Sequence, residues 1–267
     1  MKIMKNNLTF YCSEQMSRIP GLVHGFSSRT GGVSQGAFSS LNFGLQDDPS
    51  SVKENYRLAM EALGISHLVM GHQQHTDTIL PVTMCDAGRG ISVSTRFPEG
   101  VDGLTTNTPG LALGVLGADC PGILFCDPRS KSIGAAHSGW RGTVMKIGAK
   151  TMLQMKELYG ADPQTTYAVI GPSIQQCCFE TGLEVAEEFQ KAYGSVYPQI
   201  GTRVKDKAFL NLSAAICYDL EQVGMVKEHI TVLPHCTMCE NDIFFSHRKG
   251  DRGRICGFIA LNDSHNQ

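Results

Sequence analysis

Three residues of types that bind transition metals stand in unlike local contexts in this chain. His75 lies in Gln-Gln-His-Thr-Asp, Cys120 in Gly-Ala-Asp-Cys-Pro and His137 in Ala-Ala-His-Ser-Gly-Trp-Arg-Gly. Two imidazoles and one thiolate would give a Zn²⁺ ion three protein ligands and leave its fourth position open, as in catalytic rather than structural zinc sites. Their separations of 45 and 17 residues match no local zinc-finger spacing, so their convergence depends on the fold.

Short apolar runs predict the strands that would carry two of these residues. The runs at 111–116, 122–126 and 132–137 are separated by turn-forming Asp-Cys-Pro and Asp-Pro-Arg-Ser segments, which predicts three successive buried strands. Cys120 would then lie on the first connection and His137 at the end of the third strand. Both side chains are therefore expected to emerge at one sheet edge.

Helical and extended patterns alternate along the rest of the chain. Ser51 and Glu54 have the spacing of a capping box, and the apolar residues that follow predict a helix ending at Gly64. A long helix is predicted after His137, with an apolar stripe that ends before Gly160. The other expected elements are helices at 183–193 and 210–223 and strands at 166–171, 230–233 and 255–261. This mixture predicts an α/β fold with a mixed sheet, and since no linker divides residues 1–267, we expect a single domain.

The composition favours a small-molecule substrate. The chain has 267 residues, 42% of them hydrophobic, with a formal net charge of −2 and a pI near 6.5. These values argue against a general attraction to nucleic acid or anionic membranes. No stretch approaches the roughly 20 apolar residues of a membrane span, and no secretory h-region follows the first residues, so we expect a cytoplasmic protein that is a monomer or a homodimer.

Ten cysteines are many for a cytoplasmic chain, but they are scattered rather than packed into a short disulfide framework. Cys236 and Cys239 form a Cys-x-x-Cys pair, which indicates redox chemistry or half of a structural zinc site, although no second such pair completes it. The adjacent Cys177 and Cys178 are expected to pack beneath the site as small hydrophobes.

Longer motifs resemble one known family over nearly the whole chain. The segments that carry the resemblance are 24–34 (HGFSSRTGGVS), 40–44 (SLNFG), 74–75 (QH), 118–121 (ADCP), 135–142 (AAHSGWRG), 170–174 (IGPSI) and 244–248 (FFSHR). The chain resembles the YfiH family of multicopper-polyphenol-oxidoreductase laccase-domain proteins, which includes purine nucleoside phosphorylases with associated adenosine deaminase activity. The resemblance implies a layered α/β/β/α sandwich with mixed sheets, and it implies that His75, Cys120 and His137 are both metal ligands and catalytic residues.

Candidate substrate contacts surround these ligands in the sequence. Arg29 lies in a glycine-rich loop, where a guanidinium can bind phosphate through two parallel hydrogen bonds, and Asn42 would assist it. Arg248 is a second candidate for binding an anion or the substrate, with a basic hairpin loop as the alternative. Asp119 and Glu180 are candidates for proton transfer.

The resemblance implies phosphorolysis of purine nucleosides, in which phosphate attacks the anomeric carbon of the ribose. Adenosine, inosine and guanosine are the expected substrates, methylthioadenosine is a further candidate, and adenosine deamination is expected at the same centre. Zn²⁺ is the expected cofactor and Cu²⁺ the alternative. Three other hypotheses stay open: a copper-dependent polyphenol oxidoreductase, a metal-independent hydrolase with Cys120 as nucleophile and His137 as base, and a metal-dependent binding protein whose ligands only stabilise a surface.

His72 is three residues before His75 and is expected to support it from outside the ligand set.

Overall fold

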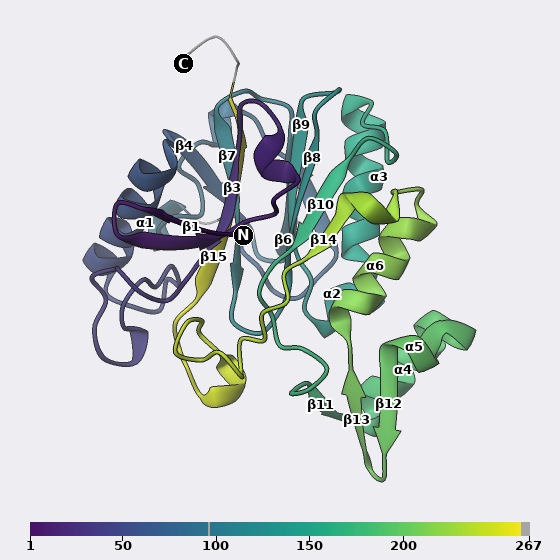
Figure 1. The fold of residues 1–267 in the computed structure, drawn as a ribbon. Helices are drawn as coiled ribbons and strands as arrows, with labels where there is room; N and C mark the ends of the chain where they lie inside the picture. Colours follow the sequence, from purple (N-terminus) through teal and green to yellow (C-terminus); the bar gives the residue numbers. More distant parts are fainter. Residues whose placement is uncertain (96, 263–267) are drawn as a thin grey trace.

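Two six-stranded sheets face each other in this protein (Figure 1). The computed structural model describes residues 1–95 and 97–262. In spatial order, the first sheet contains β1 (Lys2–Lys5), β2 (Leu8–Tyr11), β3 (Leu22–Ser27), β15 (Ile255–Leu261), β7 (Leu111–Gly117) and β4 (His67–Met70). The second contains β14 (Ile230–Val232), β10 (Tyr167–Ile170), β8 (Gly122–Asp127), β9 (Ser132–His137), β6 (Val101–Thr106) and β5 (Thr78–Pro81).

Both sheets are mixed. Strand β4 pairs with β7, β5 with β6 and β14 with β10 in parallel, while the other neighbours in these two sheets are antiparallel. Every residue of β6, β8 and β9 is buried. Such continuous burial is expected where both faces of a sheet are covered.

Helices cover the outer face of each sheet. One apolar cluster joins α1 (Pro49–Leu63) to the first sheet, and another joins α3 (Ile147–Tyr159) and α6 (Leu212–Gln222) to the second. A third cluster, which includes Val115 and Leu124, fills the space between the sheets. The predicted α/β/β/α sandwich is therefore confirmed.

A small third sheet projects from the main body at the lower right of Figure 1. It consists of β11 (Glu180–Gly182), β13 (Lys207–Leu210) and β12 (Gly201–Val204), with α4 (Leu183–Tyr193) and α5 (Tyr197–Ile200) beside it. Single 3₁₀ turns lie at Met16–Arg18, Gly36–Phe38, Met84–Asp86, Val93–Thr95, Gly194–Val196, Lys227–His229 and His247–Lys249.

The structure corrects two predicted helices. Helix α1 begins after Asp48, whose carboxylate accepts the Ser51 N–H at 2.9 Å, so the predicted capping box at Ser51 is wrong, and Glu54 instead pairs with Arg57. The long helix after His137 is two helices, α2 (Trp140–Val144) and α3, because Lys146 adopts a left-handed conformation with φ of 62°. The predictions also missed β1–β6 and β11–β13, which are short or lack a clear alternation of apolar and polar residues.

We expect the Asp48→Ala variant to lower the Tm by about 2–4 °C, because it leaves an N-terminal N–H of α1 without its acceptor. Thermal unfolding followed by circular dichroism measures this shift. The Glu54→Ala variant serves as the control, since the Glu54 side chain makes only an exposed ion pair. A larger shift for Glu54→Ala than for Asp48→Ala would restore the capping-box interpretation.

Candidate metal centre

The fold brings His75, Cys120 and His137 together where the chain crosses from the first sheet to the second. His75 lies on the loop from β4 to β5, and Cys120 lies on the crossing from β7 to β8. The Cys120 sulfur is 3.9 Å from His75 Nε2, and one ligand atom from each of the three residues lies within 4.8 Å of the others. Gly122 at the start of β8 pairs with His137 at the end of β9, so Cys120 and His137 emerge at the same edge of the second sheet, as expected. Strand β7, which precedes Cys120, belongs to the first sheet.

Asp102 on β6 holds two of these residues in place. Its carboxylate accepts backbone N–H bonds from Gln74, His75 and Thr76 at 2.9–3.0 Å, and it lies 2.8 Å from His137 Nδ1. His75 has a φ of 62°, a left-handed conformation that costs a non-glycine residue on the order of 1 kcal/mol unless its surroundings hold it. The hydrogen bonds to Asp102 supply that restraint, and they leave His137 Nε2 free to bind a metal.

The sequence analysis missed Asp102. Its signal was an acidic residue beside Val101 and Gly103, which is unusual in a strand whose every residue is buried. A buried carboxylate is stable only where hydrogen bonds or charges compensate it, so such a position indicates a functional contact.

Gly139 leaves room beside the ligands. A Cβ at this position would lie 2.8 Å from His75 Cδ2 and 3.0 Å from the Cys120 sulfur, so a larger residue would displace the two side chains. The space, the donor set of one thiolate and two imidazoles, and the carboxylate behind His137 fit Zn²⁺, and the same donors also suit copper.

The charged forms of Asp102, His137 and Cys120 stabilise one another. Burial alone would raise the pKa of Asp102, but hydrogen bonds from His137 and from backbone N–H groups lower it to about 2. Burial would lower the pKa of His137, whereas Asp102 and Cys120 raise it to about 9. Burial would raise the pKa of Cys120, but the two imidazoles lower it to about 6, so the thiolate that a metal requires is available at neutral pH.

A cavity of about 480 Å³ opens beside the three ligands. Its wall contains several groups able to bind anions or donate hydrogen bonds: His72, Gln74, His247, Arg252 and Arg254. The turn His247–Lys249 and the residues that follow it bring three of these groups to the cavity. The sequence analysis overlooked Arg252 and Arg254, although they follow the FFSHR motif closely.

The predicted phosphate ligands lie outside the lining of this cavity. The Arg29 guanidinium pairs with Asp251 at 3.2 Å and stacks 4.3 Å from the centre of the Phe245 ring. Asn42 is fully buried, and its amide oxygen accepts the Arg254 N–H at 2.8 Å. These contacts position the loop that carries Arg252 and Arg254, while direct contact of Arg29 and Asn42 with phosphate stays a prediction.

Arg248 also lies outside the lining of the cavity. Its guanidinium donates to the Cys178 carbonyl at 3.4 Å and lies 5.7 Å from the centre of the Phe179 ring. Contact with substrate therefore stays a prediction for this residue too.

The candidates for proton transfer are also placed. Asp119 accepts hydrogen bonds from Thr237 Oγ1 at 2.6 Å and from the Arg248 backbone N–H at 2.7 Å, so it joins two loops. Glu180 is exposed at the start of β11, and its carboxylate oxygen lies 3.8 Å from Lys207 Nζ. His72 lines the cavity, where Gln74 contacts its ring at 3.4 Å. Neither acid faces the cavity, whereas His72 does.

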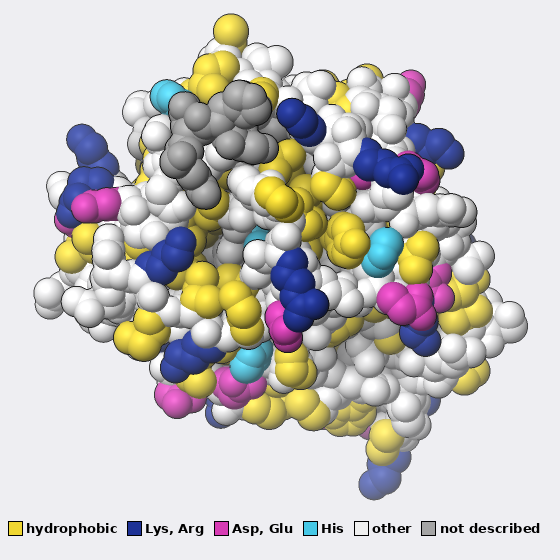
Figure 2. Space-filling view, turned by 45° about the horizontal axis from the view of Figure 1, so that its top comes forward, with side chains coloured by type: hydrophobic (Ala, Val, Ile, Leu, Met, Phe, Trp, Pro, Cys, Tyr) yellow, Lys and Arg dark blue, Asp and Glu magenta, His cyan; other side chains and the backbone are white. Residues whose placement is uncertain are grey.

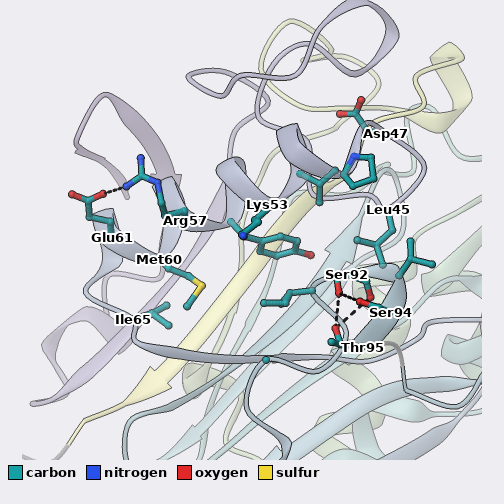
Figure 3. A pocket seen from close by; sticks show the side chains of 16 residues that line it. Leu45, Asp47, Lys53, Arg57, Met60, Glu61, Ile65, Ser92, Ser94 and Thr95 are labelled. Carbon is teal, nitrogen blue, oxygen red and sulfur yellow. Dashed lines mark hydrogen bonds and ion pairs between the residues drawn. The ribbon is translucent and has the colours of Figure 1, made fainter.

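A second cavity, of about 940 Å³, lies between α1 and residues 88–95 (Figure 3). Its surface is mostly apolar, with Met60 and Ile65 among the side chains on its wall. Among the charged groups on its wall, Arg57 pairs with Glu61 at 2.7 Å. The wall of this cavity is therefore mainly apolar and, among the residues that the structure describes, brings together no group of candidate catalytic residues.

On the face shown in Figure 2, basic and acidic side chains lie among one another. This distribution agrees with the net charge of −2. No helix within residues 1–95 and 97–262 is long and apolar enough to cross a membrane.

The fold is an α/β/β/α sandwich, and a candidate His₂Cys metal centre lies beside a polar cavity where the chain crosses from one sheet to the other. The model of the family described as multi-copper polyphenol oxidoreductase laccase matches residues 23–262, and the chain belongs to this family.

Named relatives and a solved structure extend this comparison. The purine nucleoside phosphorylase YlmD of Bacillus subtilis is 33% identical, over 91% of this chain and 90% of its own. Adenosine deaminase RL5, from an unknown prokaryotic organism, is 34% identical over 85% of this chain and 88% of its own. The crystal structure of YlmD from Geobacillus stearothermophilus has a TM-score of 0.90 and 31% identity, and the match covers 98% of both chains.

We expect Asp102→Asn to weaken metal binding about 10–100-fold, because the amide no longer fixes the His137 ring through a charged acceptor. A chelator competition titration measures the affinity. Asp206→Asn, on the turn between β12 and β13, is the control. Equal metal affinity in wild type and Asp102→Asn would show that this carboxylate does not orient the ligand.

The same variant should also lose stability in a pH-dependent way. Since the folded-state pKa of Asp102 lies below its ordinary value of 3.8, its contribution, on the order of 2 kcal/mol, is complete above about pH 4 and is lost as the pH falls toward 2. Urea unfolding at pH 7 and pH 3 should therefore show a smaller difference between wild type and Asp102→Asn at the lower pH.

Proposed function

We propose that this protein is a zinc-dependent purine nucleoside phosphorylase that also deaminates adenosine. The observation that carries the proposal is the open His75, Cys120 and His137 centre beside a cavity lined by arginine and histidine side chains. The names of the relatives support the same substrates. Adenosine, inosine and guanosine are the proposed nucleosides, and methylthioadenosine is a further candidate.

In phosphorolysis, a phosphate oxygen forms a bond to C1′ of the ribose while the bond from C1′ to the purine nitrogen breaks. The electron pair leaves with the base, which takes up a proton, and the sugar becomes ribose 1-phosphate. Arg252 and Arg254 line the cavity, and their guanidinium groups would bind the phosphate and hold it in line with C1′. Holding both reactants in this geometry supplies much of the acceleration.

His75, Cys120 and His137 would hold the metal, with Asp102 fixing the ring of His137. When bound, Zn²⁺ supplies Lewis acidity at one open position, which suits deamination because that reaction needs an activated water. The His72 and His247 side chains on the cavity wall are the proposed groups that move protons to the leaving ammonia or purine.

A second candidate function rests on the sequence of contacts from Cys120 to His137 to Asp102. A low-pKa thiol, an imidazole and an orienting carboxylate also form the arrangement of a cysteine hydrolase. The position of His75 favours the metal site over the hydrolase. Its Nε2 lies 3.9 Å from the Cys120 sulfur, and a cysteine hydrolase needs no second imidazole there.

The copper polyphenol oxidoreductase is the third hypothesis. A multicopper oxidase passes electrons between several copper centres. In the part of the chain that the structure describes, the candidate metal clusters are the His₂Cys centre and a group of four cysteines. Neither resembles an array of histidines that would hold several coppers, so the phosphorylase is the better-supported proposal.

The decisive test incubates purified protein with adenosine or inosine and phosphate, and measures free base, ribose 1-phosphate and ammonia. We expect His75→Ala and His137→Ala to lose the metal and at least about 100-fold of kcat/KM, because the metal supplies several kcal/mol of transition-state stabilisation. The matched control is His67→Ala, an exposed histidine on β4. Wild-type protein that holds zinc but releases none of these products would refute the phosphorylase. Retained turnover after metal removal, with selective alkylation of Cys120 that abolishes it, would favour the cysteine hydrolase.

Variants of the arginines identify the phosphate site. We expect Arg254→Gln and Arg252→Gln to raise the KM for phosphate about 10–100-fold, since each loses a charge-assisted hydrogen bond. Steady-state kinetics with varied phosphate measure this change. Arg248→Gln is the comparison. If Arg248→Gln alone raises the phosphate KM, the inferred contact of Arg252 and Arg254 with phosphate is wrong. The sequence prediction that Arg248 binds the anion then holds.

A further inference from the structure

Four cysteines from two distant segments meet in a second cluster. Cys177 and Cys178 lie on the turn between β10 and β11, and Cys236 and Cys239 lie on the turn after β14. Their sulfur atoms all lie within 4.8 Å of one another. All four are free thiols. This convergence differs from the expected role of Cys177 and Cys178 as buried thiols, because Cys177 is exposed and Cys178 is half-buried.

The sulfur separations match a tetrahedral metal site. At a Zn–S bond length of about 2.3 Å, the sulfurs of a regular tetrahedron lie about 3.8 Å apart. The sulfur of Cys177 lies 3.7 Å from that of Cys178 and 3.8 Å from that of Cys239, and Cys178 lies 3.4 Å from Cys239. A four-iron cluster would hold its thiolates farther apart, because each would bind a different iron.

The local backbone places the four thiols without help from a disulfide. The Cys178 N–H donates to the Gln175 carbonyl at 2.9 Å. This hydrogen bond closes the turn that carries Cys177 and Cys178. The Glu240 N–H donates to the Cys236 carbonyl at 2.9 Å and closes the second turn. The Gln175 N–H also donates to the Cys236 sulfur at 3.5 Å. Such N–H contacts stabilise a thiolate, which is the form that binds a metal.

We propose that Cys177, Cys178, Cys236 and Cys239 bind one structural Zn²⁺ ion as a closed tetrathiolate site. Four protein ligands leave no position for water or substrate, which distinguishes this site from the open His₂Cys centre. Soft thiolates in tetrahedral geometry select Zn²⁺ over the hard divalent cations. The ion would neutralise the negative charge that four neighbouring thiolates carry.

This site joins loops that shape the candidate metal centre. Thr237, between Cys236 and Cys239, donates to Asp119 at 2.6 Å, and Asp119 is next to Cys120. The Ile174 N–H donates to the Asp119 carbonyl at 2.8 Å. The tetrathiolate site would therefore act as a positioning element for the Cys120 loop, and for Arg248, whose guanidinium contacts the Cys178 carbonyl.

Metal stoichiometry of the full-length reduced protein tests the proposal. We expect two zinc ions per chain in wild type, one in Cys239→Ser and one in His75→Ala, measured by inductively coupled plasma mass spectrometry. Cys85→Ser, an exposed cysteine in the turn Met84–Asp86, is the matched control and should keep both ions. Unchanged zinc content in Cys239→Ser would overturn the proposal, whatever the fate of the other centre.

Cobalt substitution identifies which ligands hold the ion, because the thiolate-to-cobalt charge-transfer absorption grows with the number of thiolates bound. This absorption should remain strong in Cys120→Ser and fall sharply in both Cys239→Ser and Cys177→Ser. A strong band that survives in the latter two variants, and is lost in Cys120→Ser, would contradict the tetrathiolate site.

Alkylation of the wild-type protein needs no variant and so does not depend on folding of a mutant. Under reducing conditions with zinc, iodoacetamide should label Cys85 but spare Cys177 and Cys239, and a chelator should expose both to labelling. Mass spectrometry of the peptides reads this out. Full labelling of Cys177 and Cys239 before chelation, or a Cys178–Cys239 disulfide in protein purified with reductant, would overturn the proposal.

Discussion

The carboxylate of Asp102 is the contact on which the candidate metal centre depends. It accepts three successive backbone N–H bonds from the His75 loop and lies 2.8 Å from His137 Nδ1. One buried negative charge thus fixes a strained loop and the tautomer of a strand-end histidine at once. Because its hydrogen bonds outweigh the cost of burial, its pKa falls to about 2 and it stays ionised at neutral pH.

The two-sheet architecture makes this contact possible. The chain leaves the first sheet at the end of β7, passes through Cys120 and enters the second sheet at β8, and Gly122 then pairs with His137 on β9. Cys120 and His137 therefore lie at the ends of buried strands. Placement at the ends of packed strands matters because a preorganised site loses little free energy to reorganisation during the reaction.

Asp119 links this centre to the group of four cysteines. Its side chain joins the turn of Cys236 and Cys239 to the turn of Arg248, and its backbone precedes Cys120. Asp119, next to Cys120, thus connects these loops. The cationic cavity wall depends on the same loop region, since Arg252 and Arg254 follow it.

The sequence by itself determined the buried strands β7, β8 and β9, most of the helices, and the identity of His75, Cys120 and His137 as metal-binding residue types. These features follow from local periodicity and from short motifs. Only the tertiary structure decided that Asp102 supports the ligands, that Arg252 and Arg254 line the cavity while Arg29 pairs with Asp251, and that four cysteines meet. The physical reason is that these contacts join residues dozens to hundreds of positions apart, and local sequence carries no record of which distant partner satisfies a buried charge or thiol.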